Sequence, residues 1–306
     1  MNQSLLQPGA LWARLLARTD QALRCGALQP IPTAYERIEQ NGIHFILRIL
    51  ASLARKDEVK KAPSGQVVGA EFNPFLPYEE DLFVADISDT HLCLLNKFNV
   101  LDHHLLIVTR KFEEQENRLN LEDFAALWSC MAEFEALAFY NSGRIAGASQ
   151  RHKHLQMVPL PLAPVGPGIP IEPVLAAARF EGSVGTAPQL PFVHAIARLD
   201  PDRLQSPQQA AAATLELYHR LLLATGLSID QPQPAPYNLL ATRQWLLLIP
   251  RSRESFESVS INALGFAGAL LVRNESQARV VREQGPLTVL RQVAIPLPEA
   301  QLPKVL

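Results

Sequence analysis

The stretch with the most reactive side chains is residues 147–156, which read Gly-Ala-Ser-Gln-Arg-His-Lys-His-Leu-Gln. Its last five residues have the pattern of a β-strand, in which alternate side chains share one face. His152, His154 and Gln156 would then project together, while Lys153 and Leu155 would point the other way. The strand would present two imidazoles and one amide to a single surface.

The four residues before this strand are small or polar and suit the binding of an anion. Gly147 and Ala148 let backbone N–H groups approach a phosphate closely, and Ser149 and Gln150 add side-chain donors. Neutral imidazole is a nucleophile near physiological pH, and its phosphoramidate is a good donor to the next acceptor. The sequence therefore predicts a phosphate that is held by this loop and attacked by a histidine.

A His-x-His pair has two other common explanations. It is more often a metal site, or a half-buried couple with satisfied hydrogen bonds, than a covalent catalyst. A zinc site needs a third ligand and usually a fourth, which could come from one of three other histidines, His103, His104 and His194. Zinc-dependent chemistry through His152 and His154 therefore stays open on these residues alone.

Residues 147–156 are similar to the signature of the ATP adenylyltransferases, also called diadenosine tetraphosphate phosphorylases. This family belongs to the histidine-triad superfamily, alongside galactose-1-phosphate uridylyltransferase. Further segments resemble the family, so that the resemblance extends over roughly residues 40 to 290. These segments are Asn73-Pro74-Phe75, residues 82–84, 94–100, 104–109 and 139–143, and in the last third residues 237–242, 245–251 and 262–268.

The resemblance implies a reaction in two displacements. His154 would attack the α-phosphorus of diadenosine tetraphosphate, expel ATP and hold AMP as a covalent adduct, and inorganic phosphate would then take the AMP to give ADP. The catalytic residues would be His152, His154 and Gln156. Gln156 stands where the hydrolytic branch of the superfamily has a third histidine. An amide can hydrogen-bond a phosphate oxygen but cannot deliver a proton to the leaving group.

The resemblance also implies a set of substrate-binding residues. Asn141 would contact a ribose or a phosphate, residues 147–150 would hold the polyphosphate, and Lys97 would neutralise phosphate charge. Ala269 and Arg273 stand where the family has methionine and lysine, which leaves the preference among dinucleotides open. The full set is Lys56, Asn96, Lys97, Asn141, Gly147, Ala148, Ser149, Gln150, Asn262, Ala263, Leu264, Ala269 and Arg273, with Lys56 chosen over Lys60 and Lys61.

The elements that would position these residues alternate along the chain. Apolar spacing predicts helices over residues 11–28, 120–139 and 208–225, the second capped by Asn120. Short β-like runs occupy residues 44–50, 82–87, 91–95, 105–110, 155–158 and 191–199, with a hairpin of 237–242 and 245–250. The proline-rich residues 159–170 read as a crossover loop. Strands in meanders with segregated helices indicate an α+β fold.

We therefore expect the histidine-triad fold, in which helices pack on an antiparallel sheet elaborated at both ends of the chain. Residues 1–165 would carry the catalytic motif. Residues 166–306 would form the C-terminal ATP adenylyltransferase lobe, in one compact unit with the first part.

Composition limits the partners and the compartment. With 48% apolar and 19% charged residues and a formal net charge of −2, the chain lacks the overall basic charge typical of nucleic-acid binding. No apolar run approaches the roughly 20 residues that cross a bilayer, so we expect no membrane partner. The three cysteines, Cys25, Cys93 and Cys130, suggest neither disulfides nor a zinc ribbon, and a reducing cytoplasm fits best.

The expected partners are small nucleotides: diadenosine polyphosphates, ATP, ADP and phosphate. No cofactor or protein-bound metal is expected, although Mg²⁺ or Mn²⁺ could accompany the nucleotide. The oligomeric state is open. One alternative function is a nucleoside-diphosphate-sugar transferase like galactose-1-phosphate uridylyltransferase. Another is a non-catalytic sensor of diadenosine tetraphosphate, which would need no nucleophilic imidazole.

Overall fold

The computed structural model describes residues 5–51, 72–163 and 166–297. Its centre is a ten-stranded sheet in the order β3-β4-β5-β7-β6-β11-β12-β10-β9-β8, in which every neighbouring pair is antiparallel. The strands are β3 (Phe83–Asp86), β4 (His91–Leu95), β5 (Leu105–Thr109), β6 (Ala136–Asn141), β7 (His154–Pro159), β8 (Arg179–Glu181), β9 (Val184–Thr186), β10 (Ala195–Arg198), β11 (Tyr237–Ala241) and β12 (Trp245–Pro250).

Two smaller sheets accompany it. In the first, β2 (Ile43–Leu50) lies between β1 (Thr33–Gln40) and β15 (Ala269–Val272) and pairs in parallel with β15, so residues from both ends of the chain meet there. The second is the hairpin of β13 (Ser255–Phe256) and β14 (Val259–Ser260). Within the described residues, the α-helices are α1 (Leu11–Cys25), α3 (Leu121–Met131), α4 (Glu172–Ala176), α5 (Pro207–Ala224), α6 (Ala263–Phe266), α7 (Glu275–Gln284) and α8 (Pro286–Val293), and the short 3₁₀ helices are η1 (Glu80–Leu82), η2 (Arg144–Ala146) and η3 (Pro201–Arg203).

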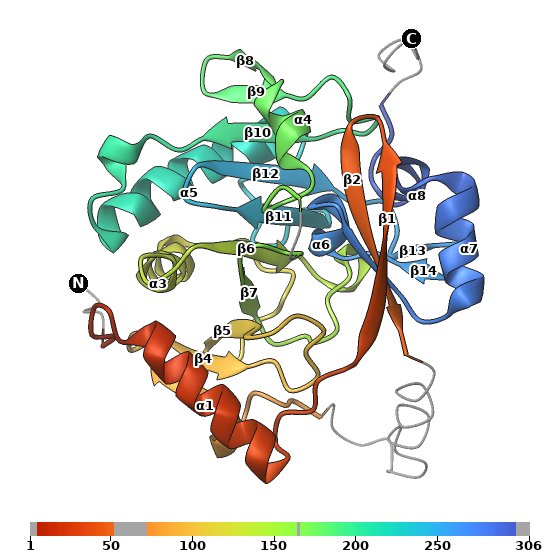
Figure 1. Ribbon diagram of the computed structural model, residues 1–306. Helices are drawn as coiled ribbons and strands as arrows, with labels where there is room; N and C mark the ends of the chain where they lie inside the picture. Colours follow the sequence, from red (N-terminus) through yellow and green to blue (C-terminus); the bar gives the residue numbers. More distant parts are fainter. Residues whose placement is uncertain (1–4, 52–71, 164–165, 298–306) are drawn as a thin grey trace.

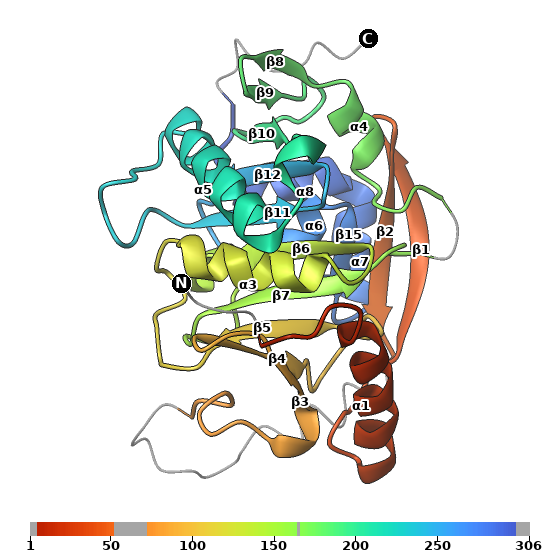
Figure 2. The ribbon, with the colours of Figure 1, turned by 90° about the vertical axis from the view of Figure 1, so that its left-hand side faces the viewer.

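The central sheet separates two apolar layers. Helices α3 and α5 cover one face and α1 packs near its lower end, while the small β1-β2-β15 sheet and helices α6 to α8 lie on the other (Figures 1 and 2). Strand β7 contributes to both layers, because Leu155 and Met157 join the helical core whereas Val158 joins the opposite one. The odd and even positions of β7 therefore face different surroundings, as the alternation in the sequence predicts.

The predicted α+β architecture with an antiparallel sheet is confirmed. The predicted helix over residues 120–139 is wrong in its second half. The side chain of Asn120 caps α3 as expected and forms a capping box with Asp123, but α3 ends at Met131 and residues 136–141 form the central strand β6. Every residue of β6 is buried, and a short run that is apolar on both faces cannot be assigned to helix or strand from periodicity alone.

Two further differences concern the N-terminal elements. Helix α1 ends at Cys25 rather than at residue 28, because Gly26 takes the left-handed conformation that terminates a helix. Strand β1 was not predicted; three of its eight residues, Glu36, Arg37 and Glu39, are charged, as suits a sheet edge.

The central sheet is continuous across the expected boundary between residues 1–165 and 166–306. Strand β6 from the first part pairs directly with β11 from the second, from Ala138↔Ala241 to Asn141↔Asn238. In the described ranges, no helix has both the length and the apolar composition needed to cross a membrane.

Candidate active site

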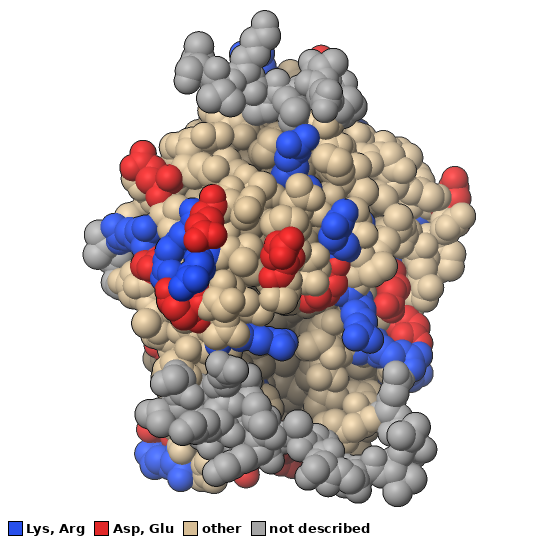
Figure 3. Space-filling view, turned by 90° about the vertical axis from the view of Figure 1, so that its right-hand side faces the viewer, with Lys and Arg blue, Asp and Glu red and all other residues tan. Residues whose placement is uncertain are grey.

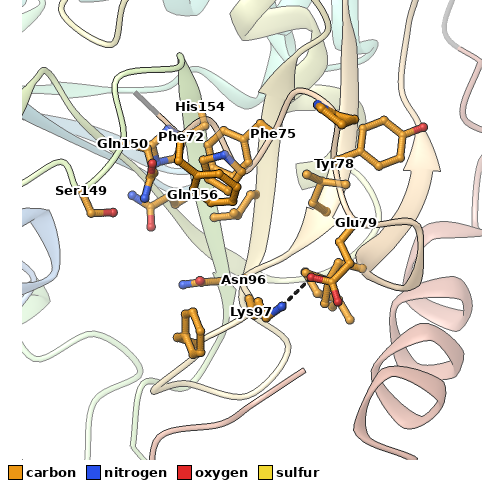
Figure 4. Close-up of a pocket in the computed structure, with 17 residues that line it drawn as sticks. Phe72, Phe75, Tyr78, Glu79, Asn96, Lys97, Ser149, Gln150, His154 and Gln156 are labelled. Atoms are coloured by element: carbon orange, nitrogen blue, oxygen red, sulfur yellow. Dashed lines mark hydrogen bonds and ion pairs between the residues drawn. The ribbon is translucent and has the colours of Figure 1, made fainter. Parts of the chain in front are cut away.

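A cavity of about 640 Å³ lies beside β7, between the loop that precedes this strand and the segment that follows residue 72. His154 and Gln156 of β7 line it together with Ser149, Gln150, Asn96 and Lys97 (Figure 4). Its remaining wall is largely apolar and includes Phe72, Phe75, Tyr78, Leu94, Phe98 and Leu106. The structure thus brings together six of the residues predicted from the sequence.

The imidazole of His154 is held in one orientation. Its Nδ1–H donates to the backbone carbonyl of His152 over 2.8 Å, which assigns the tautomer because a carbonyl oxygen only accepts. Nε2 is left with a lone pair and has no hydrogen-bond partner among the described residues. Burial lowers the pKa of His154 to about 4, although the bond to the carbonyl opposes this shift. The ring is therefore neutral at pH 7 and able to act as a nucleophile.

His152 has a different environment from His154. Its Nε2–H donates to the carbonyl of Thr109 over 2.8 Å, and its Nδ1 accepts from the side-chain amide of Asn73 over 3.0 Å. It lines an adjoining hollow of about 530 Å³ with Phe112 and Arg151, and this hollow shares Phe72, Ser149 and Gln150 with the cavity of His154. His152 does not line the cavity of His154 itself, although the strand alternation predicted that both rings would face one surface. It acts on His154 through its backbone carbonyl.

The zinc alternative finds no support in this geometry. Both ring nitrogens of His152 are engaged by protein groups, so the ring offers no lone pair to a metal. Over residues 5–51, 72–163 and 166–297, no group of three His, Cys, Asp or Glu side chains is arranged to hold a metal ion.

The side-chain amide of Gln156 is oriented by a chain of hydrogen bonds. Asn96 Nδ2 donates to His104 Nδ1 over 3.1 Å, and His104 Nε2–H donates to Gln156 Oε1 over 3.0 Å. Burial lowers the pKa of His104 to about 4, so this ring is also neutral. Since the oxygen of Gln156 is occupied, its NH₂ group is available to an acceptor in the cavity.

Lys97 is less free than the sequence suggests. Its ammonium group donates to Glu79 Oε2 over 2.6 Å at the cavity wall, with about a third of the lysine side chain exposed (Figure 4). A phosphate that reached Lys97 would have to compete with this carboxylate.

Lys153 lies between the two histidines in sequence but faces the helical layer. Its ammonium group contacts the carboxylate of Asp123 in α3 over 2.6 Å, and both side chains are buried. Burial alone would raise the pKa of Asp123, but the hydrogen bond from His91 and the charge of Lys153 together lower it. This pair ties the residue immediately before β7 to α3.

Four of the remaining predicted residues line part of a smaller hollow of about 210 Å³: Gly147, Asn262, Ala269 and Arg273. Asn141 lies near it, because its Oδ1 accepts over 2.9 Å from the backbone N–H of Ala263, the residue after Asn262. Four predicted residues line neither hollow: Asn141, Ala148, Ala263 and Leu264. Lys56 lies outside the described residues.

Gly147 shows how closely the loop approaches this second group. Its φ angle is +91°, and a Cβ atom added there would lie 2.6 Å from the carbonyl oxygen of Ile261 and 2.8 Å from Asn262 Cα. Glycine is therefore needed for both reasons, its backbone conformation and its lack of a side chain.

Sequence reasoning missed several residues around the nucleophile. Asn73 and Phe75 were part of the resemblance but received no role; the structure places Asn73 on His152 and the ring of Phe75 with its centroid 5.2 Å from that of His154. Glu79 could not be assigned to the site from the sequence, because a single acidic residue in a loop is usually exposed to solvent.

The face shown in Figure 3 carries basic and acidic side chains intermixed rather than a broad basic surface, and it is hollowed below its centre.

Comparison with known proteins gives the family. A model of the Ap4A phosphorylase N-terminal domain matches residues 1–177, and a model of the ATP adenylyltransferase C-terminal domain matches residues 188–296. The chain belongs to the Ap4A phosphorylase family. Together the two matches include every residue of the predicted site, and both describe the adenylyl branch rather than the uridylyltransferase alternative.

Relatives of this Ap4A phosphorylase family member occur in Saccharomyces cerevisiae. Diadenosine 5',5'''-P1,P4-tetraphosphate phosphorylase 2 is 27% identical over 274 residues, covering 80% of this chain and 81% of the relative. Protein APA1 is 24% identical over 285 residues, covering 85% of each. Yeast Apa2 crystallised with Ap4A has a TM-score of 0.76 at 21% identity, covering 95% of this chain and 99% of Apa2. This likeness shows the same fold.

Proposed function

We propose that this chain catalyses the phosphorolysis of diadenosine tetraphosphate to ADP and ATP, and the reverse exchange, through an adenylyl group on His154. A yeast relative carries the name of this activity. The observation that supports the covalent route is the state of His154: its Nδ1–H is bonded to a carbonyl, and its Nε2 lone pair is unengaged beside the cavity.

In the first displacement, Nε2 attacks the α-phosphorus and the bond from this phosphorus to the bridging oxygen breaks, so that ATP leaves. The ring keeps its Nδ1 proton and becomes cationic. The His152 carbonyl stabilises this charge, because a hydrogen bond from a charged donor is stronger than one from a neutral donor. In the second displacement, an oxygen of inorganic phosphate attacks the same phosphorus, the P–N bond breaks, and ADP leaves with the neutral imidazole restored.

The cavity residues would stabilise charge on the transferred phosphoryl group. The NH₂ of Gln156 would donate to an α-phosphate oxygen, and because an amide does not titrate it would not protonate the leaving ATP. Ser149 and Gln150 would hold the polyphosphate, with Asn96 and Lys97 near its distal part. The hollow at Asn262, Ala269 and Arg273 would receive a nucleoside. A divalent cation would enter on the nucleotide phosphates.

We also propose that the enzyme works in a reducing compartment such as the cytoplasm. The buried sulfur atoms of Cys93 and Cys130 lie 3.6 Å apart as free thiols, an arrangement compatible with a reducing environment.

The deciding experiment incubates wild type and His154→Ala with diadenosine tetraphosphate and phosphate and separates the nucleotide products by chromatography. We expect ATP and ADP from wild type and a loss on the order of 10⁴-fold or more in the variant, because the nucleophile is gone. His219→Ala, a histidine of α5 away from the cavity, is the matched control. Intact-mass measurement without phosphate should show an AMP-sized adduct on wild type and on the His219→Ala control, and none on His154→Ala.

Other outcomes would identify the alternatives. Binding of the dinucleotide with neither products nor adduct would indicate a sensor. Release of a sugar phosphate from a nucleoside-diphosphate sugar, with no phosphorolysis, would indicate the uridylyltransferase type. Unchanged turnover in His154→Ala would overturn the covalent route.

A further inference from the structure

The neighbouring strands β6 and β7 stop pairing just before the nucleophile. Strands β6 and β7 are paired from Ala136↔Pro159 to Phe139↔Gln156. In the same register, the next hydrogen-bonded positions would include Asn141 of β6 opposite His154 of β7. These two residues are not paired with each other. The side chain of Gln115, from a segment outside both strands, lies between them.

Gln115 satisfies the backbone groups that the separation of the strands leaves open. Its Oε1 accepts from the backbone N–H of His154 over 2.8 Å. Its Nε2 donates to the backbone carbonyl of Asn141 over 2.9 Å and to that of His154 over 3.1 Å. The side-chain amide thus takes the place of a peptide unit in the ladder and contacts both backbone polar groups of the nucleophile.

Gln115 is itself firmly placed. Its side chain is fully buried. Its backbone N–H donates to the carbonyl of Arg151 over 2.7 Å, and its own carbonyl accepts from the hydroxyl of Tyr140. The backbone of the neighbouring Glu114 forms an isolated antiparallel β-bridge with that of His152. The segment is therefore fixed both to β6 and to the residues immediately before the nucleophile.

The separated strands carry the two ends of the candidate site. His154 bears the attacking nitrogen, and Asn141 holds the backbone of Ala263, the residue after Asn262 at the second hollow. If β6 and β7 continued to pair, the backbones of His154 and Asn141 would come closer to each other by the width of the inserted amide. The distance between the nucleophile and the second hollow therefore depends on the Gln115 side chain.

We infer that Gln115 is a positioning residue for the nucleotidyl transfer. It holds the backbone of His154 at a fixed distance from Asn141, so that a phosphorus atom bound between the two hollows is aligned with Nε2. This inference rests on the proposed function. It assigns Gln115 no contact with substrate, and it predicts an effect on the rate of adduct formation rather than on nucleotide affinity.

The test compares Gln115→Met and Gln115→Glu with wild type in single-turnover adenylylation without phosphate, together with Kd for AMP. Met has a similar length but cannot hydrogen-bond, so the rate of adduct formation should fall roughly 10²-fold, as expected for a displacement of the order of 1 Å. Kd for AMP should stay within about threefold of wild type.

Gln115→Glu adds a readout that packing alone would not produce. A protonated carboxyl group can donate to the Asn141 carbonyl and accept from the His154 N–H as the amide does, whereas a carboxylate can only accept. Relative to wild type at the same pH, this variant should be slow at pH 8 and recover towards pH 6. Gln115→Met should show no such recovery.

Thr214→Val is the control for lost stability. It removes the acceptor of the buried Trp128 indole N–H, 2.7 Å away between α3 and α5, without touching the cavity. It should lower Tm while leaving the rate per folded molecule unchanged. The inference is overturned if folded Gln115→Met forms the adduct at the wild-type rate, or if its rate falls only in proportion to AMP affinity. Absence of an adduct in wild type would instead overturn the proposed function.

Discussion

His104 and His154 lie in the same buried region, and burial lowers the pKa of each to about 4. Neutral rings have fixed donor and acceptor nitrogens, which is why one can orient the Gln156 amide while the other keeps a lone pair. The sequence predicted His154 and Gln156 from their spacing. It could not predict that His104 would contact Gln156, since 52 residues separate them and only the pairing of β5 with β7 brings them together.

Glu79 provides a test of the cavity charge. Because its carboxylate is bonded to Lys97 over 2.6 Å, it competes with any phosphate that approaches this lysine. Glu79→Gln should therefore lower KM for the dinucleotide by about two- to fivefold, the range expected for an exposed ion pair worth up to ~1 kcal/mol. Steady-state kinetics at low salt would measure it.

Lys97→Met is the counterpart and should raise KM. Both effects should shrink at high ionic strength, because salt screens exposed charges. If KM in Glu79→Gln equals the wild-type value at low salt, Lys97 does not contact the substrate phosphates.

Strand β7 and the loop before it are the elements that carry the site, and here sequence patterns were informative only in part. The alternation of residues 152–156 correctly separated His154 and Gln156 from Lys153, whose ammonium group binds Asp123 in α3. The adjacent strand β6 was mistaken for the end of a helix, because a fully buried strand has no polar face to reveal its period. Gln115 could not be found either, since its role arises only where β6 and β7 separate.

Gly147→Ala tests the contact between this loop and the Asn262 segment. The new Cβ would meet backbone atoms of residues 261 and 262 at less than 3 Å, at a φ of +91°. We expect a loss of about 2–4 kcal/mol in the free energy of unfolding from conformational strain plus overpacking, with weaker AMP binding. Urea unfolding and calorimetric titration would measure the two effects.

Gly226→Ala is the matched control. Gly226 has a similar φ of +76°, but an added Cβ would meet nothing within 4 Å. It should cost only about 1–2 kcal/mol and leave AMP binding unchanged. Equal losses in the two variants, with AMP binding intact in both, would contradict a close contact at Gly147.

The molecule as a whole combines two sequence segments in one sheet. The antiparallel α+β architecture was predictable from short strands and segregated helices, as were α5 and the hairpin of β11 and β12. The small sheet of β1, β2 and β15 could not be predicted. It pairs residues from opposite ends of the chain, and a local sequence pattern does not indicate which distant strand will be the partner.

The buried histidines predict how this fold responds to acid. Burial lowers the pKa of His104 and His154 to about 4, whereas an unfolded histidine titrates near its ordinary value of about 6.5. Between these values the unfolded chain binds more protons, so stability should fall as the pH decreases from about 6.5 towards 4. We expect a loss of about 2 kcal/mol or more over this window, measured as the urea midpoint.

In His104→Asn the free energy of unfolding should decrease less steeply with falling pH, since this variant has one fewer histidine that binds a proton on unfolding. A urea midpoint that is constant between pH 6.5 and 4.5 would contradict the prediction.

The pairing of β6 with β11 has a consequence during synthesis of the chain on the ribosome. Until residues 237–241 have emerged, β6 exposes one line of backbone N–H and C=O groups in the middle of an unfinished sheet. An exposed strand edge of this kind attracts other strands, including those of a neighbouring nascent chain. The first half of this protein should therefore aggregate when it is produced as a separate polypeptide. If the gene were split between β6 and β11, the two products would have to be co-expressed for the sheet to form.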